Sequence, residues 1–76
     1  MKAYVLINIR PGAIKEVVKN LRRLDNIAEA HMTFGPYDAV AVIEADSLAK
    51  IGSIIYSDVQ PIPGVLETLT CLAVDI

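Results

Sequence analysis

Cysteine, histidine and tryptophan are nearly absent from this chain of 76 residues, which has one cysteine, one histidine and no tryptophan. The single Cys71 excludes an internal disulfide. One cysteine and one histidine also cannot supply the ligands that a structural zinc ion needs. We therefore expect no metal site, and we assign no cofactor to the chain.

Positive charge is also scarce, with seven Lys and Arg residues against nine Asp and Glu residues. The net charge is −2 and the isoelectric point is about 5.1. Domains that bind nucleic acid usually carry an excess of basic residues. We therefore expect no direct contact with nucleic acid.

Long hydrophobic runs are missing. The longest segments without a charged side chain are eight residues, as in residues 30–37 and 59–66. This is far short of the roughly 20 apolar residues that cross a bilayer, so we expect no membrane span. The short apolar run after Lys2 has no small-residue cleavage site behind it, which argues against a secretory signal. The expected location is the cytoplasm.

Apolar residues are nevertheless abundant, at 54% of the chain, and the mean hydropathy is +0.48. We expect one domain over residues 1–76, without a DNA-binding domain. A domain of this size buries only about 60% of the surface that its unfolded chain exposes. The apolar excess therefore predicts that the protein associates with itself.

Hydrophobic periodicity predicts four strands, over residues 3–9, 27–34, 39–45 and 65–74. It also predicts two helices, one over residues 13–24 and one from a cap at Asp46 or Ser47 to Asp58. Residues 35–38 have the chemistry of a hairpin turn. The order β-α-β-β-α-β indicates an α+β, ferredoxin-like fold, in which a four-stranded antiparallel sheet carries both helices on one face.

Several strands are apolar on both sides. In the first strand Ile7 and Ile9 alternate with Tyr4 and Leu6, and the strand over residues 39–45 shows the same pattern. Two helices can cover only one face of the sheet. We therefore expect a dimer in which two sheets stack about 10 Å apart.

Two side chains could carry reactive chemistry, and each has a structural alternative. His31 is either a general base or a half-buried or interface histidine. Cys71 is either a nucleophile or a buried small hydrophobic residue. The basic side chains of the first helix either steer an anion or acidic partner, or are simply solvated; they are Lys15, Lys19, Arg22 and Arg23.

The turn between the middle strands suits a zwitterionic ligand. The backbone N–H groups near Gly35 could face a carboxylate, Tyr37 could form a wall, and Asp38 could face an ammonium group. A hairpin turn with an Asx-type hydrogen bond explains the same residues. Thr68 and Thr70 lie two positions apart in the last strand and should share one face, where cross-strand hydroxyl pairing is the alternative role.

Four segments together resemble a known family. They are Val-Leu-Ile-Asn-Ile-Arg-Pro-Gly at residues 5–12, Phe-Gly-Pro-Tyr-Asp-Ala-Val at 34–40, Ala-Asp-Ser-Leu at 45–48 and Ile-Pro-Gly-Val-Leu-Glu-Thr-Leu-Thr at 62–70. In this order and spacing, they are similar to the effector-binding domain of the leucine-responsive regulator and AsnC (Lrp/AsnC) family. The resemblance covers almost the entire chain and is to the stand-alone form of this domain, the RAM module.

The resemblance implies sheet-to-sheet dimers that assemble into rings, commonly octamers, and bind an amino acid effector where dimers meet. By position, the implied ligand-binding residues are Gly35, Tyr37, Asp38, Thr68 and Thr70. It also implies association with full-length relatives through the shared ring-forming surface.

Two functional hypotheses follow. The first is a non-enzymatic module that binds an amino acid, forms oligomers and modulates full-length Lrp/AsnC transcriptional regulators. The alternative is a small dimeric α+β barrel enzyme, of monooxygenase or isomerase type, with His31 as its base.

Overall fold

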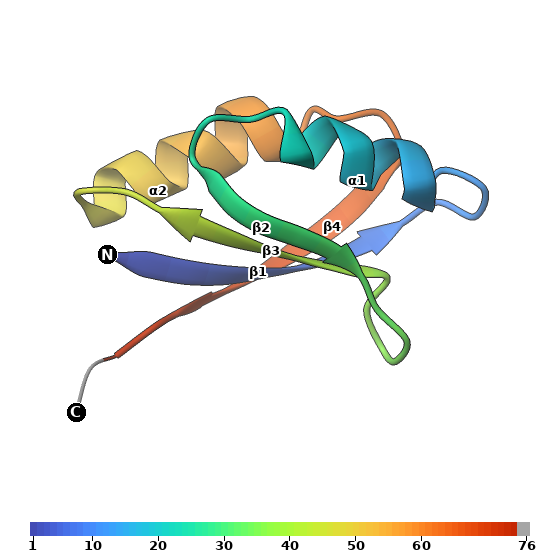
Figure 1. Ribbon diagram of the computed structural model, residues 1–76, viewed down its shortest axis with the longest axis horizontal. Helices are drawn as coiled ribbons and strands as arrows, with labels where there is room; N and C mark the ends of the chain where they lie inside the picture. Colours follow the sequence, from blue (N-terminus) through green and yellow to red (C-terminus); the bar gives the residue numbers. More distant parts are fainter. Residues whose placement is uncertain (75–76) are drawn as a thin grey trace.

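A computed structural model describes residues 1–74 of the chain. The strands are β1 (Lys2–Ile9), β2 (Ile27–Met32), β3 (Ala39–Glu44) and β4 (Val65–Leu72). The helices are α1 (Ile14–Arg22) and α2 (Leu48–Ile54), and α2 continues as a π-helical turn, η1 (Ile55–Val59). Figure 1 shows both helices on one side of the sheet. The predicted β-α-β-β-α-β order is confirmed.

The sheet has the strand order β2-β3-β1-β4, and all three neighbouring pairs are antiparallel. β1 and β3 are therefore central, and β2 and β4 form the edges. The predicted ferredoxin-like fold is confirmed.

The core lies between the sheet and the helices. One face of the two central strands is fully covered, and α1 and α2 cover it with branched side chains; this core includes Val5, Ile7, Ala41, Ile43, Val17, Leu21, Ile51 and Ile54. Each fully buried valine, leucine or isoleucine contributes about 1.5–3 kcal/mol relative to an exposed one. The inward-facing residues of β1, which alternate, and the apolar residues of α1, which recur every 3.6 residues, thus belong to the same core.

The first helix differs from its predicted bounds, whereas the second begins at one of its two predicted caps. α1 ends at Arg22 rather than at residue 24, because the amides of Arg23 and Leu24 bond to carbonyls only three residues back, at 3.2 and 3.1 Å. Ser47, rather than Asp46, caps α2, with its Oγ accepting from the Lys50 amide at 3.1 Å.

The second helix also changes its winding, which the periodicity did not predict. The amide of Gln60 donates to the carbonyl of Ile55, five residues back, at 2.8 Å. Ile54 and Val59 are five residues apart and both are buried. The wider turn thus brings the last apolar residue of the helix into the core.

β2 departs from regular strand alternation at its start. Ile27 pairs with Ile43, whereas Glu29 already pairs with Val42, so one residue is extra. This bulge puts Ile27 on the covered face, opposite to Glu29. β2 also ends two residues early, at Met32, and residues 33–38 form a longer connection to β3 than the predicted four-residue turn. β3 and β4 end at Glu44 and Leu72, one and two residues before their predicted ends.

The sheet face away from the helices remains apolar at its centre. Cross-strand pairing aligns two rows on this face, one of Val42, Tyr4 and Cys71 and one of Val40, Leu6 and Leu69. We call these six residues the open face. Tyr4 is 42% exposed and Leu69 is 48% exposed. The prediction that two central strands are apolar on both sides is confirmed.

Candidate functional site

Asp38 is fixed in place by the neighbouring strand β1. Its Oδ2 accepts a hydrogen bond from the Ile9 amide at 2.7 Å, and its own amide donates to the Ile7 carbonyl at 2.9 Å. Within residues 1–74, the other carboxylate oxygen has no hydrogen-bond donor. The alternative interpretation, an Asx-type bond within the turn, is not seen among these residues, because the carboxylate bonds to a strand 29 residues away instead. Asp38 thus presents one oriented oxygen for a ligand.

The loop from β2 to β3 is closed by a second pair of bonds. The Thr33 amide donates to the Asp38 carbonyl at 3.0 Å, and the Thr33 hydroxyl donates to the Tyr37 carbonyl at 2.8 Å. Gly35 has a φ of 135°, which side chains rarely tolerate, and it is exposed. Tyr37 is half-buried. The three predicted residues of this loop therefore lie in one ordered segment.

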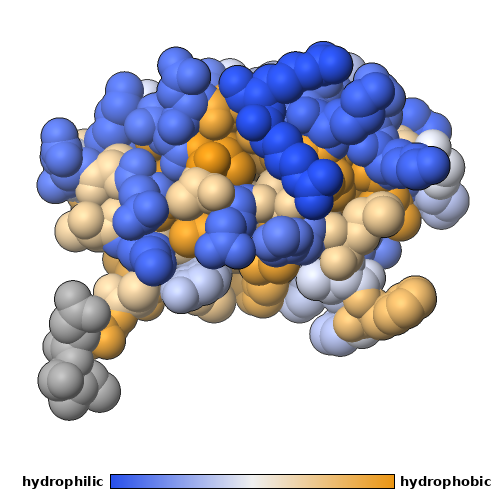
Figure 2. All heavy atoms as spheres, in the orientation of Figure 1, coloured by the Kyte–Doolittle hydropathy of each residue, from blue (hydrophilic) through white to orange (hydrophobic). Residues whose placement is uncertain are grey.

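A hollow of about 350 Å³ adjoins this loop. We call it the loop hollow, and its lining consists of Ile14, Met32, Thr33, Phe34 and Asp38. Met32 is 57% exposed and Phe34 is fully exposed. Figure 2 shows hydrophobic atoms projecting at this end of the molecule, at the lower right. The hollow combines apolar walls with one carboxylate.

Thr68 and Thr70 lie on β4, on the helix side of the sheet, opposite Ile7 and Val5 of β1. Glu67 points to the other face, where its Oε1 accepts from Asn8 Nδ2 at 2.9 Å. The prediction that the two threonines share a face is confirmed. Thr68 Oγ1 accepts from Gln60 Nε2 at 3.2 Å, so it has a side-chain partner rather than a cross-strand hydroxyl.

One chain does not bring the five predicted residues together. Ile7 of β1 pairs with Ala39 on one side and with Thr68 on the other. Thr68 is therefore about 9.5 Å, or two strand spacings, from the strand that follows the loop. Gly35, Tyr37 and Asp38 form one group, and the two threonines form another at the far edge.

Three apolar walls of the hollow were missed in the sequence. Ile14 begins α1, Met32 ends β2 and Phe34 lies in the loop, so the hollow joins segments about twenty residues apart. A signal was present, because Met32 and Phe34 continue an apolar alternation up to the turn. The sequence pattern does not show which distant segment packs beside such residues, because that depends on the tertiary structure.

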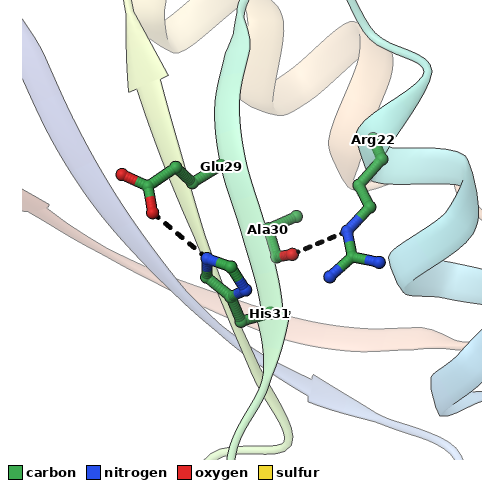
Figure 3. A network of polar contacts seen from close by, with 4 residues as sticks. All are labelled: Arg22, Glu29, Ala30 and His31. Atoms are coloured by element: carbon green, nitrogen blue, oxygen red, sulfur yellow. Dashed lines mark hydrogen bonds and ion pairs between the residues drawn. The ribbon is translucent and has the colours of Figure 1, made fainter.

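His31 is an exposed side chain on the edge strand β2. Its Nε2 lies 3.1 Å from Glu29 Oε1, and both side chains are more than half exposed. Figure 3 shows this pair pointing away from Arg22, whose Nε donates to the Ala30 carbonyl at 2.8 Å. An enzyme of the dimeric α+β barrel type needs a substrate pocket between sheet and helices, and in this chain the core fills that space. The geometry favours a surface or interface role for His31.

Cys71 and the basic helix face have simpler descriptions. Cys71 is a free thiol on the open face and is exposed, so the expectation of a buried cysteine is wrong for the single chain. The basic side chains of α1 are all exposed, and none of them forms an ion pair within residues 1–74. In that part of the chain, three or more His, Cys, Asp or Glu side chains do not gather as metal ligands would. It also contains no helix long and apolar enough to cross a membrane.

Comparison with known proteins identifies relatives. The transcriptional regulator FL11 of Pyrococcus abyssi, of the HTH type, is 33% identical over 72 residues, which are 95% of this chain and 47% of FL11. This chain spans about half the length of the curated relatives it matches. The crystal structure of TTHA0845 from Thermus thermophilus superposes with a TM-score of 0.93 at 27% identity, and covers 99% of this chain and 94% of that one.

A more distant structure shares the fold alone. The transcriptional regulator NMB0573 of Neisseria meningitidis, crystallised as a complex with L-Met, superposes with a TM-score of 0.87 at 12% identity over 97% of this chain and 49% of that one. The model of the Lrp/AsnC ligand-binding domain matches residues 2–76. On this match and on the 33% identity to FL11, the chain belongs to the Lrp/AsnC ligand-binding domain family.

Proposed function

We propose that this domain binds a free amino acid and couples that binding to the assembly of several copies of the chain. The observation that carries the proposal is Asp38, whose carboxylate is held by the Ile9 amide at 2.7 Å and has one oxygen left for a ligand. A carboxylate in such a position favours a charged donor such as an ammonium group. The NMB0573 complex with L-Met supports an amino acid as the ligand class.

The ligand's two charged groups would meet different partners. Its ammonium group donates to Asp38, and its carboxylate accepts from backbone N–H groups near the exposed Gly35. Tyr37 supplies part of the wall. Thr68 and Thr70 lie two strands away in the same protomer, so they would complete the site from a neighbouring chain.

Dimerisation through the open face would create the first level of assembly. That face is apolar and partly exposed in the single chain, and exposed apolar patches usually mark interaction sites. Stacking two such faces would bury Tyr4, Leu6 and Leu69 in a second core. Further contacts between dimers would form a ring, with an octamer as the expected size.

The same surfaces would connect this domain to longer proteins. FL11 is named as an HTH-type transcriptional regulator, and this chain matches about half of it. A copy of this domain could therefore take the place of a relative's own ligand-binding domain in a mixed ring. It would then modulate a DNA-bound regulator in the cytoplasm without contacting nucleic acid itself.

Catalysis is no part of this proposal. The relatives are named as regulators, and the one histidine is exposed and paired with Glu29. No carboxylate–nucleophile set surrounds His31 among the described residues, so nothing in the geometry favours the barrel-enzyme alternative.

Calorimetric titration with each of the twenty amino acids tests the proposal. Asp38→Asn keeps an oxygen for the Ile9 amide but removes the charge, so binding should weaken about 10- to 100-fold, as expected for loss of a bond to a charged group. His31→Ala is the matched control and should bind like the parent. Equal affinity of Asp38→Asn and the parent would overturn the site, and turnover that depends on His31 would overturn the function.

A further inference from the structure

Most hydrogen-bonding groups of the side chains that line the loop hollow already have a partner within the protein. Of its five lining residues, only Thr33 and Asp38 have polar side chains. The Thr33 hydroxyl hydrogen is already donated to the Tyr37 carbonyl, and one oxygen of Asp38 is taken by Ile9. Two hydrogen-bond acceptors remain for a ligand, which are the second carboxylate oxygen of Asp38 and the hydroxyl oxygen of Thr33.

The apolar side chains of the hollow, in contrast, still expose much of their surface to solvent. Met32 is 57% exposed and Phe34 is fully exposed, while Ile14 is half-buried and packs against the core. A methionine side chain is flexible and adapts its shape to an apolar neighbour. A ligand side chain placed on these three residues would remove apolar surface of both molecules from water.

We infer that the loop hollow selects amino acids with a medium-sized apolar side chain, namely valine, leucine, isoleucine or methionine. This inference rests on the proposed function, because it takes the ammonium group of the ligand to lie on Asp38. The side chain of the ligand then lies against Met32, Phe34 and Ile14, all of which line the same hollow as Asp38.

The side chains of this chain that line the hollow offer little to the other side-chain classes. An amide or hydroxyl would lose its water with only the Thr33 oxygen to replace it, which should weaken binding about tenfold or more. A basic side chain would be repelled by the like charges of Lys15, Lys19 and Arg22, which line an adjoining hollow that shares Met32. An acidic side chain would share the loop hollow with the Asp38 carboxylate. Glutamate is therefore the most informative competing ligand, because Lys15, Lys19 and Arg22 would attract its side chain while Asp38 would repel it.

Pairs of ligands with similar shape give the sharpest measurement. Leucine and asparagine have similar branching, as do valine and threonine, but the second member of each pair is polar. By calorimetry, leucine should bind at least about tenfold more tightly than asparagine, and valine more tightly than threonine. Glutamate should bind more weakly than leucine.

Substitutions in the walls should change this preference and not merely the affinity. Met32→Ser and Phe34→Ser should each lower the affinity for leucine about 3- to 30-fold and leave that for asparagine nearly unchanged. Tyr56→Ser is the matched control, because Tyr56 is an aromatic residue, 75% exposed, on η1 and outside the hollow. It should leave the ratio of leucine to asparagine affinity unchanged. Because that ratio is taken within each variant, a general change in assembly does not move it.

The outcomes separate this inference from the proposed function. If the parent binds none of the twenty amino acids, the proposed function fails. If it binds asparagine or glutamate as tightly as leucine, or if both wall variants keep the parent's ratio, the function stands and the inference of apolar selectivity is wrong.

Discussion

Replacing Gly64 with alanine should destabilise the protein far more than the same change at Gly12. Both glycines follow a proline and both have positive φ, of 102° and 87°. An alanine there is strained at either position, at a cost of about 1–2 kcal/mol. Alanine also reduces the freedom of the unfolded chain, which returns about 0.4–1 kcal/mol. These two effects are shared by both variants.

The surroundings of the two glycines differ. A Cβ at Gly64 would lie 2.7 Å from the Ala13 Cβ and 3.2 Å from the Val17 Cγ2, whereas at Gly12 it would meet nothing within 4 Å. The Gly64 segment cannot easily shift, because its carbonyl accepts from the Arg10 amide at 2.7 Å. Overpacking of this kind costs about 1–3 kcal/mol. We therefore expect a loss of about 0–2 kcal/mol for Gly12→Ala and about 1–5 kcal/mol for Gly64→Ala.

Urea unfolding of both variants and the parent measures this difference. All samples need the same protomer concentration, because assembly contributes to the apparent stability. The difference between the two variants isolates the overlap with Ala13 and Val17. Equal losses for the two variants, within about 0.5 kcal/mol, would refute the packing described for the Gly64 turn.

Two further perturbations probe the second helix and the open face. Ser47→Ala removes the oxygen that accepts from the Lys50 amide, so urea unfolding should show a loss of about 0.5–2 kcal/mol; an unchanged midpoint would contradict the cap. Leu69→Lys places a charge on the open face, beside Leu6 of the central strand β1. Light scattering should then give a smaller species than the parent, while Tyr56→Lys, on the exposed side of η1, should assemble normally. A parent that stays at 8.2 kDa at micromolar concentration would rule out the proposed dimer.

The fold could be predicted from the sequence because its signals are local and mutually consistent. The apolar alternation in β1 and the period of α1 each identify one element and its buried face. The errors occur where tertiary packing adds or removes one residue. The bulge before Glu29 and the π-helical turn of η1 each insert a residue that brings Ile27 or Val59 into the core. No local pattern distinguishes such an insertion from regular structure.

The candidate site was less accessible to sequence reasoning. Asp38 was identified from its turn, but its bond to Ile9 crosses 29 residues and depends on the pairing of β1 with β3. The hollow beside it needs Ile14, which belongs to another element. Residues that are adjacent in a turn can be grouped from sequence, whereas a wall contributed by a distant helix requires the fold.

The bond between Asp38 and Ile9 links folding to ligand binding, and two substitutions can separate these roles. Asp38→Ala leaves the Ile9 amide without its acceptor in a partly buried position, which should lower the free energy of unfolding by about 1–3 kcal/mol. Asp38→Asn can still accept that bond and should lose less than about 1 kcal/mol. Both variants should bind an amino acid poorly, since neither has the charge. If Asp38→Asn were as unstable as Asp38→Ala in urea, its weak binding would reflect a disturbed loop, and the assignment of the carboxylate to the ligand's ammonium group would lose its support.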